Sequence, residues 1–172
     1  MSREKIEEIY RELIGEDGLE RYTHKEIIEY IKRLKDDNFN LKIKTNGQKL
    51  YEFTNETYDW IKDNNFKNGI LNISIQHTSA SLIVQENADP DVQTDLINYF
   101  DKLAPMDNKL YIHTTEGKDD MPAHIKSALT NNQISLSIKD SHLLLGTWQG
   151  LYLFEHRLTP QKRKIIHHFL GK

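Results

Sequence analysis

The chain of 172 residues is long enough for one globular domain with a short additional segment, and too short for two domains of ordinary size. It contains 37% hydrophobic and 28% charged residues and no cysteine, which excludes disulfides, zinc–thiolate sites and cysteine nucleophiles. The net charge of −3 comes without a large basic cluster, and no run of residues is apolar enough to cross a bilayer. We therefore expect a soluble cytoplasmic protein with neither nucleic acid nor membrane as a partner.

Residues 1–37 predict a helical hairpin. Apolar residues recur at helical spacing from Ile6 to Ile14, which indicates one amphipathic helix. A capping box formed by Thr23 and Glu26 begins a second helix, which carries its own apolar stripe. These stripes need a surface to cover them, so we expect the hairpin to pack on its own body, on a neighbouring subunit or on another protein.

Residues 38–172 form the predicted main domain. Alternating apolar residues from Phe39 to Phe53, divided by a turn at Asn46-Gly47, predict a β-hairpin. Further predicted elements are a helix around 58–61, strands at 71–77 and 82–84, a helix at 90–103, a strand at 110–113, a helix at 122–129 and strands at 134–138, 143–145, 151–157 and 165–170. Because the links between the last four strands are short, antiparallel pairing and the α+β class are favoured.

Three histidines fall on separate predicted elements of this domain. His77 ends a strand, His124 lies in the first turns of a helix, and His156 lies on a strand. Three neutral imidazoles can hold a divalent ion and leave one coordination position open for water or substrate. The alternative is that the three histidines are unrelated and that each is hydrogen-bonded locally.

A turn with three carboxylates precedes the predicted helix of His124. Glu116, Asp119 and Asp120 lie around Gly117, where they can coordinate a metal or transfer protons. The alternative interpretation is a solvated turn whose aspartates cap the helix.

Two further pairs of polar residues are candidates for binding a ligand. Ser79 and Ser81 follow His77, and we predict that their hydroxyls bind a ligand or a phosphate, because adjacent strand positions face opposite sides and do not make a serine–histidine pair. Trp148 and Gln149 lie between glycines, where they can form a stacking platform with an amide; the alternative is a buried indole at a tight turn.

The order of these motifs resembles the YjbQ family, an uncharacterised family often labelled secondary thiamine-phosphate synthase. The resemblance covers residues 40–171. The matching motifs are His77-Thr-Ser-Ala-Ser81, Glu86-Asn87 with Asp89-Pro90, His113 with Glu116-Gly117, Asp119-Asp120-Met121-Pro122 with His124, Gly146-Thr-Trp-Gln-Gly150 and Glu155-His156-Arg157.

This resemblance implies an α+β domain built mainly from antiparallel β-sheet as a sandwich, with two or three helices, assembled as a homotrimer. It also implies an enzyme that joins hydroxymethylpyrimidine diphosphate to a thiazole phosphate with loss of pyrophosphate, using a divalent ion such as zinc, manganese or magnesium. Ser141-His142 and Gln93 depart from the family pattern, in which more basic residues are common, and these departures are expected to weaken phosphate binding.

The sequence and the resemblance together give three predicted sets of site residues. The predicted metal ligands are His77, His124 and His156; the predicted catalytic residues are His113, Glu116, Asp119 and Asp120; the predicted substrate and phosphate contacts are Ser79, Ser81, Asn87, Trp148, Gln149 and Arg157. The alternatives to the synthase are a metal-dependent hydrolase of a phosphorylated small molecule, with one of the carboxylates as base, and a non-catalytic metal or metabolite-binding module.

Overall fold

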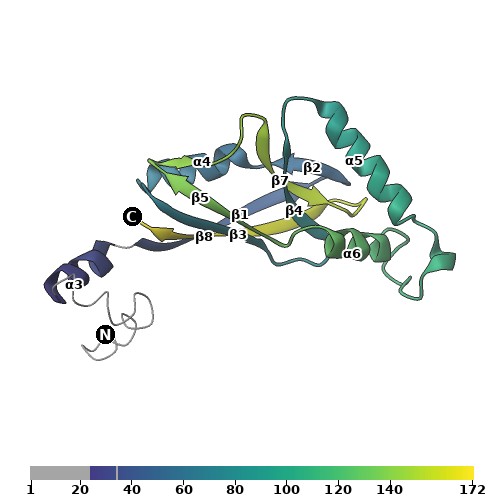
Figure 1. The fold of residues 1–172 in the computed structure, drawn as a ribbon. Helices are drawn as coiled ribbons and strands as arrows, with labels where there is room; N and C mark the ends of the chain where they lie inside the picture. The colour runs from purple at the N-terminus through teal and green to yellow at the C-terminus, as the bar shows by residue number, and fades with distance from the viewer. Residues whose placement is uncertain (1–23, 34) are drawn as a thin grey trace, which may run out of the picture. The chain divides into compact units, whose positions relative to one another are not determined.

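The structure is a computed structural model that describes residues 24–33 and 35–172 (Figure 1). The chain divides into an N-terminal unit, which ends at Lys35, and a C-terminal unit of residues 36–172, here called the body. In the N-terminal unit the described element is helix α3, His24–Arg33, which corresponds to the second predicted helix. The first predicted helix and the Thr23 cap lie outside the described residues.

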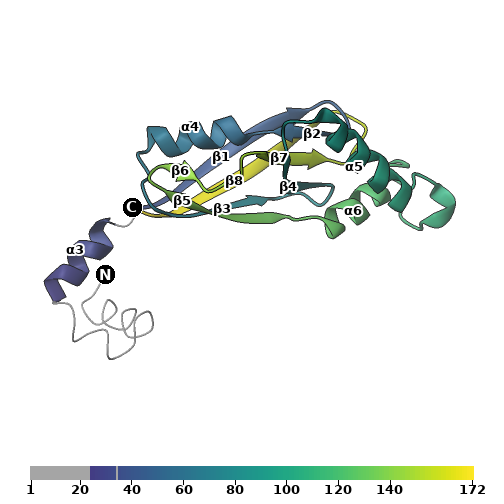
Figure 2. The same ribbon diagram turned by 45° about the horizontal axis from the view of Figure 1, so that its top comes forward.

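The body is an α+β structure, as predicted, with two β-sheets and three α-helices (Figures 1 and 2). Its elements are β1 Lys35–Thr45, β2 Lys49–Glu52, α4 Thr54–Asp63, β3 Gly69–Ile75, β4 Ala80–Glu86, α5 Pro90–Leu103, the 3-10 turn η1 Asn108–Leu110, α6 Asp120–Leu129, β5 Gln133–Lys139, β6 His142–Leu143, β7 Gln149–Glu155 and β8 Gln161–Gly171. One sheet has the strand order β1-β8-β3-β5-β6 and the other has the order β2-β7-β4. No described helix is long and apolar enough to span a membrane.

The main core lies between the two sheets. Alternate residues of β3, such as Leu71 and Ile73, pack against residues of β7 from the other sheet, such as Leu151 and Leu153, and all four are fully buried. Helix α4 adds Ile61 to the same core. On the opposite face of the three-stranded sheet, α5 covers a smaller apolar cluster. The body is therefore a sandwich with one additional helical layer.

The predicted hairpin of residues 39–53 is wrong, because its two strands belong to different sheets. β1 lies at the edge of the five-stranded sheet, whereas β2 pairs with β7 in the three-stranded sheet. The turn between them contains Gly47 with a φ of 95° and carries the chain from one layer to the other. Alternation of apolar residues is the same in both arrangements, because each strand has one face toward the core.

The predicted strand of residues 110–113 is also wrong. The Asp107 side chain accepts a hydrogen bond from the N–H of Lys109 at 2.9 Å, and this turn begins η1 in place of a strand. Leu110 and Ile112 are exposed, at 61% and 103%. The segment has strand-forming residues, but no described strand pairs with it.

Candidate metal centre

The centre lies at the N-terminal end of α6. Asp120 and His124 are separated by one helical turn, so their side chains share a face of the helix. The segment before the helix supplies His113 and turns back at Gly117, which has a φ of 113° and so a conformation that favours glycine. These local features bring a carboxylate and two imidazoles together.

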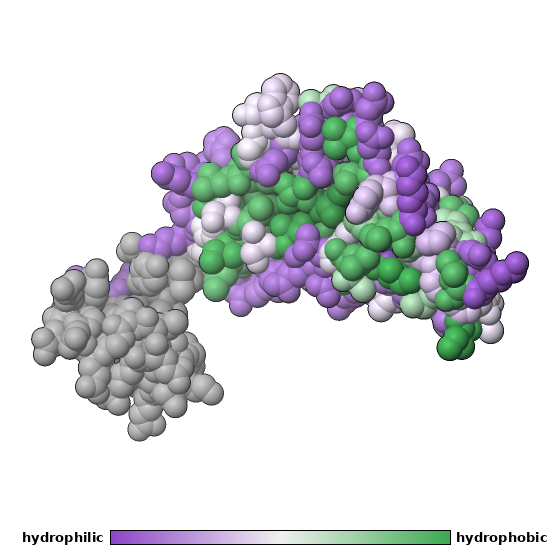
Figure 3. Space-filling model, turned by 45° about the vertical axis from the view of Figure 1, so that its right-hand side comes forward, coloured by the Kyte–Doolittle hydropathy of each residue, from purple (hydrophilic) through white to green (hydrophobic). Residues whose placement is uncertain are grey.

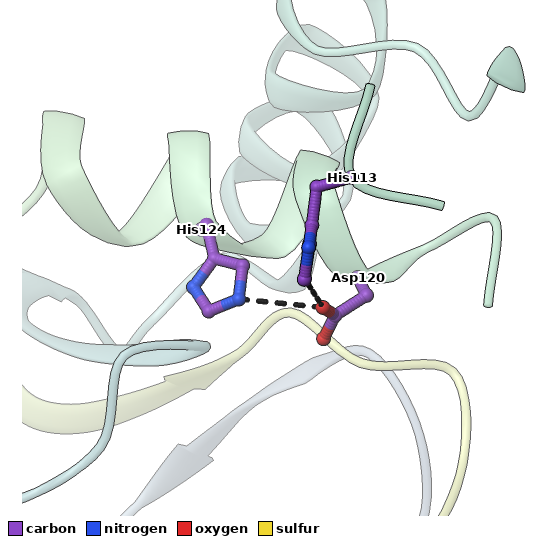
Figure 4. Close-up of side chains that lie close together, drawn as sticks. All are labelled: His113, Asp120 and His124. Atoms are coloured by element: carbon purple, nitrogen blue, oxygen red, sulfur yellow. Dashed lines mark hydrogen bonds and ion pairs between the residues drawn. The ribbon is translucent and has the colours of Figure 1, made fainter. Parts of the chain in front are cut away.

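The three side chains converge on one carboxylate oxygen (Figure 4). Nε2 of His113 lies 2.8 Å from Oδ2 of Asp120, and Nε2 of His124 lies 3.3 Å from the same atom. All three ligand atoms lie within 4.8 Å of one another. The Asp120 side chain is 2% exposed, whereas the side chains of His113 and His124 are 44% and 32% exposed. The centre is thus closed on the protein side and open on the side of the histidines.

The tautomer of His124 follows from its second hydrogen bond. Nδ1 of His124 lies 3.0 Å from the backbone carbonyl oxygen of Thr78, which can only accept, so Nδ1 carries the proton. In the neutral imidazole the lone pair is then on Nε2, which faces the negative Oδ2 of Asp120. Two electron-rich atoms at 3.3 Å repel each other unless a proton or a cation lies between them.

Arg157 holds the other side of the carboxylate. One of its terminal nitrogens, Nη1, donates to Oδ1 of Asp120, and its Nε donates to Oδ2 of Asp119 at 3.0 Å. Its Nη2 donates to the carbonyl oxygen of Glu116 at 2.8 Å. The guanidinium therefore fixes the segment before α6 and leaves Oδ2 of Asp120 for the two imidazoles.

Asp119 remains ionised in this environment. Burial alone would raise the pKa of its carboxyl, but the hydrogen bond from the N–H of Leu158 and the contact with Arg157 outweigh burial and lower the pKa below its ordinary value. The Arg157 guanidinium, for which burial alone would lower the pKa, has its pKa raised by Asp119 and then by Asp120. The pair is a fixed structural contact.

The donor set suits a divalent ion. Two imidazole nitrogens and one carboxylate oxygen are common ligands of zinc and of other transition metals, and three protein ligands leave a coordination position for water or substrate. The proton on Nδ1 of His124 is held by a backbone carbonyl, as is usual for a histidine that binds metal through Nε2. The residues present therefore fit a metal ion.

The structure does not assemble the three histidines that were predicted as one ligand set. In the described part of the chain, no group of three metal-binding side chains includes His77 or His156. Nε2 of His77 accepts a hydrogen bond from the backbone N–H of Lys164 at 3.0 Å. His156 is fully buried, and its Nε2 lies 2.9 Å from the hydroxyl of Ser81. His124 is thus joined by His113 and Asp120, both of which were predicted to be catalytic.

Burial keeps these other two histidines neutral. It lowers the pKa of His156 to about 3, and the positive charges of Lys126 and Arg163 act in the same direction. For His77, burial followed by the charge of Arg163 lowers the pKa. Both side chains make hydrogen bonds inside the body, His77 with β8 and His156 with β4, whereas the buried Nδ1 of His156 has no hydrogen-bond partner among the described residues. This is closer to the alternative that the sequence left open, in which the histidines are unrelated.

The predicted ligand-binding hydroxyls are also committed within the chain. The Ser79 hydroxyl accepts from Nη2 of Arg163 at 3.1 Å, and Ser81 is fully buried against His156. The Ser81 hydroxyl therefore does not reach solvent, whereas Ser79 is half-buried and keeps its own hydroxyl hydrogen.

Trp148 and Gln149 lie at the other end of the three-stranded sheet. In the register of β4 and β7, Glu86 pairs with Gln149 at one end and Ala80 pairs with Glu155 at the other. Seven residues of strand separate the two ends, which is about 20 Å. Asn87 belongs to the same distant end, because its N–H donates to the carbonyl of Trp148. The chain therefore does not bring these three residues to Arg157.

The sequence contained a signal for the observed group. An aspartate and a histidine four residues apart at the start of a helix place two metal-binding side chains on one face, and this spacing identifies Asp120 with His124. His113 was predicted as a catalytic residue, but its segment was predicted as a strand, so its place beside Asp120 and His124 did not follow from local spacing.

A family model described as UPF0047 protein YjbQ-like matches residues 39–172 of the chain. The chain belongs to the YjbQ family. A UPF0047 protein of Synechocystis is 48% identical over 132 residues, which are 77% of this chain and 90% of that protein. A UPF0047 protein of Methanocaldococcus jannaschii is 38% identical over 134 residues, 77% of this chain and 94% of that protein.

Solved structures of YjbQ proteins have the same fold. An uncharacterised YjbQ/UPF0047 protein of Clostridium acetobutylicum superposes with a TM-score of 0.68 at 30% identity and covers 77% of this chain and 98% of its own. A protein of Sulfolobus solfataricus described as of unknown function superposes with a TM-score of 0.74 at 18% identity, covering 81% of this chain and all of its own. These structures confirm the predicted fold class, and the YjbQ family remains one of uncharacterised function.

Proposed function

We propose that this YjbQ protein binds a divalent metal ion through His113, Asp120 and His124 and uses it in the hydrolysis of a phosphorylated small molecule. One observation carries the proposal: Nε2 of His113, Oδ2 of Asp120 and Nε2 of His124 lie within 4.8 Å of one another, and the Thr78 carbonyl holds the Nδ1 proton of His124 so that Nε2 faces the group. The exposed sides of the two histidines leave room for a substrate to approach.

A divalent ion in this position would act as a Lewis acid toward a phosphoryl oxygen and would make a neighbouring water molecule more acidic. The chain's own residues prepare the site for that chemistry. Arg157 orients the Asp120 carboxylate through Oδ1, and the Thr78 carbonyl orients the His124 ring. Both are hydrogen bonds to side chains that would otherwise rotate, so they fix the donor geometry before a ligand arrives.

Glu116 is the best candidate for a general base among the three predicted carboxylates. Asp120 is buried in the centre, and Oδ2 of Asp119 is occupied by Arg157 and by the N–H of Leu158. The lowered pKa of Asp119 also makes it a weak base. The Glu116 side chain is exposed, and its backbone carbonyl accepts from Nη2 of Arg157 at 2.8 Å, the same guanidinium that contacts Asp120.

The condensation of a pyrimidine diphosphate with a thiazole phosphate is the second reaction for the same metal site, and only the family resemblance supports it. It needs a platform for the pyrimidine ring next to the ion. Trp148 and Gln149 were predicted to supply it, but they lie at the far end of the β4–β7 ladder. For this reason we place hydrolysis first and condensation second.

The proposal is tested by measuring turnover in chelator-stripped protein after reloading with zinc, manganese or magnesium. Release of inorganic phosphate from a panel of phosphorylated small molecules reports hydrolysis, and release of pyrophosphate from the pyrimidine–thiazole pair reports condensation. We expect turnover to disappear on stripping, to return with metal and to be lost in His124→Ala.

His142→Ala is the matched control. His142 is an exposed histidine whose Nδ1 donates to a backbone carbonyl, as in His124, but the structure gives it no carboxylate partner. This variant should keep full turnover. Stoichiometric metal binding without turnover of any phosphorylated substrate would contradict the enzyme and leave a metal-binding module.

A further inference from the structure

A buried carboxylate lies at the last residue of β7, two positions before Arg157. Glu155 is 0% exposed, and its Oε1 accepts the backbone N–H groups of His156 at 3.1 Å and of Arg157 at 3.0 Å. Its Oε2 accepts the hydroxyl of Thr45 at 2.8 Å. Because the side chain binds the two amides that follow it, these amides do not continue the strand, and the chain leaves the sheet at this residue.

Arg163 from β8 neutralises this carboxylate with two parallel hydrogen bonds. Its Nε donates to Oε2 of Glu155 at 2.7 Å, and its Nη2 donates to Oε1 at 2.6 Å. Arg163 is 5% exposed, so the pair lies almost entirely out of water. A bidentate ion pair between buried groups is rigid, because both hydrogen bonds form only in one relative orientation of the guanidinium and the carboxylate.

The pair controls the Asp120 side of the centre through Arg157. Glu155 fixes the backbone N–H of Arg157, and the next amide, that of Leu158, donates to Oδ2 of Asp119 at 2.9 Å. With its backbone held on both sides, the Arg157 side chain reaches Asp120. The orientation of the Asp120 carboxylate therefore depends on Glu155.

The same guanidinium reaches the His124 side. Nη2 of Arg163 also donates to the Ser79 carbonyl at 3.3 Å and to the Ser79 hydroxyl at 3.1 Å. Ser79 follows Thr78, whose carbonyl accepts the proton of His124 Nδ1. Arg163 thus holds the backbone on which the second imidazole depends.

We propose that Arg163, acting with Glu155, is a positioning residue that sets the geometry of both Asp120 and His124 in the metal centre. It touches neither the metal ligands nor a substrate. The metal-affinity part of this inference rests on the proposed function, whereas the fixed position of Arg157 does not.

Arg163→Lys is the first test, because lysine keeps the positive charge but cannot form the bidentate contact with Glu155. Zn²⁺ affinity is measured by competition with a chromogenic chelator, and Co²⁺ is used as a spectroscopic probe of ligand geometry. We expect the affinity to fall by about 10- to 100-fold, as for other residues that orient metal ligands, and the Co²⁺ absorption to change.

Phe66→Leu controls for a general loss of stability. Phe66 stacks on Phe169 in the main core, near the β8 end that pairs with Gly69, whereas the β8 residues beside the centre pair with Ile75. This variant should lower Tm without changing the Zn²⁺ affinity or the Co²⁺ spectrum. Equal losses of affinity in both variants would overturn the positioning role.

A second readout is independent of metal. The Arg157 Nε–H, which donates to Asp119, should give a slowly exchanging NMR signal in the parent and in Phe66→Leu, and a rapidly exchanging one in Arg163→Lys. If the parent takes up neither Zn²⁺ nor Co²⁺, the proposed function fails and this exchange rate still decides the positioning role. Slow exchange in a folded Arg163→Lys protein would overturn it.

Thr45→Val carries the same test if Arg163→Lys does not fold. Valine has nearly the shape of threonine and removes one hydrogen bond from Oε2 of Glu155. We expect faster exchange of the Arg157 Nε–H than in Phe66→Leu, and an unchanged rate would contradict the inference.

Discussion

At the scale of single residues, Asp120 shows how one buried carboxylate is shared. Its Oδ1 is held by Arg157, and its Oδ2 is faced by His113 and His124. A carboxylate that is 2% exposed needs such partners, because an unpaired buried charge is costly. The positive guanidinium compensates the charge from behind and leaves the front of the carboxylate to the imidazoles.

Two buried histidines make the stability of the body depend on pH. The Thr57 hydroxyl donates to the Phe53 carbonyl, so it accepts a hydrogen bond from Nε2 of His167. Nδ1 of His167 has no hydrogen-bond partner among the residues that the structure describes, and the ring packs against the aromatic rings of Phe53 and Trp60. Burial lowers the pKa of His167 to about 4, and burial and neighbouring charges lower that of His156 to about 3.

Because both pKa values are lower in the folded state than the ordinary value of 6.5, the unfolded chain binds more protons as the pH falls. The contribution of these two histidines to the free energy of unfolding should be constant above pH 6.5. Between about pH 6.5 and pH 4 it should fall by about 1.4 kcal/mol per histidine per pH unit. Urea unfolding at several pH values, with a chelator present, measures this slope. His167→Gln should roughly halve it, and an unchanged slope would contradict the assignment.

At the scale of elements, the turn before α6 decides whether the centre forms. Gly117 has a φ of 113°, and a Cβ there would meet the Oδ1 of Asp119 at 3.0 Å. We predict that Gly117→Ala lowers the free energy of unfolding by about 1–3 kcal/mol because the backbone becomes strained, and weakens Zn²⁺ binding because Asp119 is displaced. Thermal unfolding and chelator competition measure the two effects.

Gly146→Ala is the matched control for that prediction. Gly146 also lies in a loop, but a Cβ there would meet the flexible Gln149 side chain at 3.3 Å, and the backbone lies outside the left-handed region. We expect a much smaller loss of stability and unchanged Zn²⁺ affinity. Equal effects of the two substitutions would refute the special role of Gly117.

The elements also show which features the sequence could predict. Helices α4, α5 and α6 and the strands of the C-terminal third follow from apolar spacing and from signals such as Asp89-Pro90, where the Asp89 side chain accepts from the N–H of Asp91. The pairing of β1 and β2 does not follow, because alternation identifies a buried face and not its neighbour.

The site was predictable to a similar extent. Asp119, Asp120, His124 and Arg157 were all singled out from the sequence, and all meet at the centre. Which histidines join them depends on which ring nitrogens are already used in hydrogen bonds within the chain. The lone pair of His77 Nε2 is used by a backbone amide of β8, 87 positions away in the chain, and no local pattern reveals that contact.

At the scale of the whole molecule, Figure 3 shows a broad apolar area across the middle of the body and smaller apolar groups to its right. Tyr99, Leu103, Leu110 and Ile112 are between 50% and 103% exposed, and α5 has no fully buried residue. Large apolar side chains that are this exposed are typical of surfaces that other chains cover. The homotrimer implied by the family resemblance stays a prediction, and this surface supports it.

Sedimentation velocity tests that prediction on the untagged chain. A homotrimer gives a species of three times the 20.2 kDa chain mass. Ile112→Glu should shift the chain toward monomer if the surface is the contact, because a buried unpaired charge is costly at an interface. Asn98→Glu, an exposed position of α5 that is already polar, is the control. A parent that sediments as a monomer would contradict the assembly.

The most direct test of the metal centre is an anomalous difference map from a crystal of the chain soaked in Zn²⁺, recorded at the zinc absorption edge. We predict one strong peak between His113, Asp120 and His124, about 2.0–2.2 Å from Nε2, Oδ2 and Nε2 respectively. A fully ordered site without a peak, or a peak on His77 or His156 in its place, would contradict the metal centre.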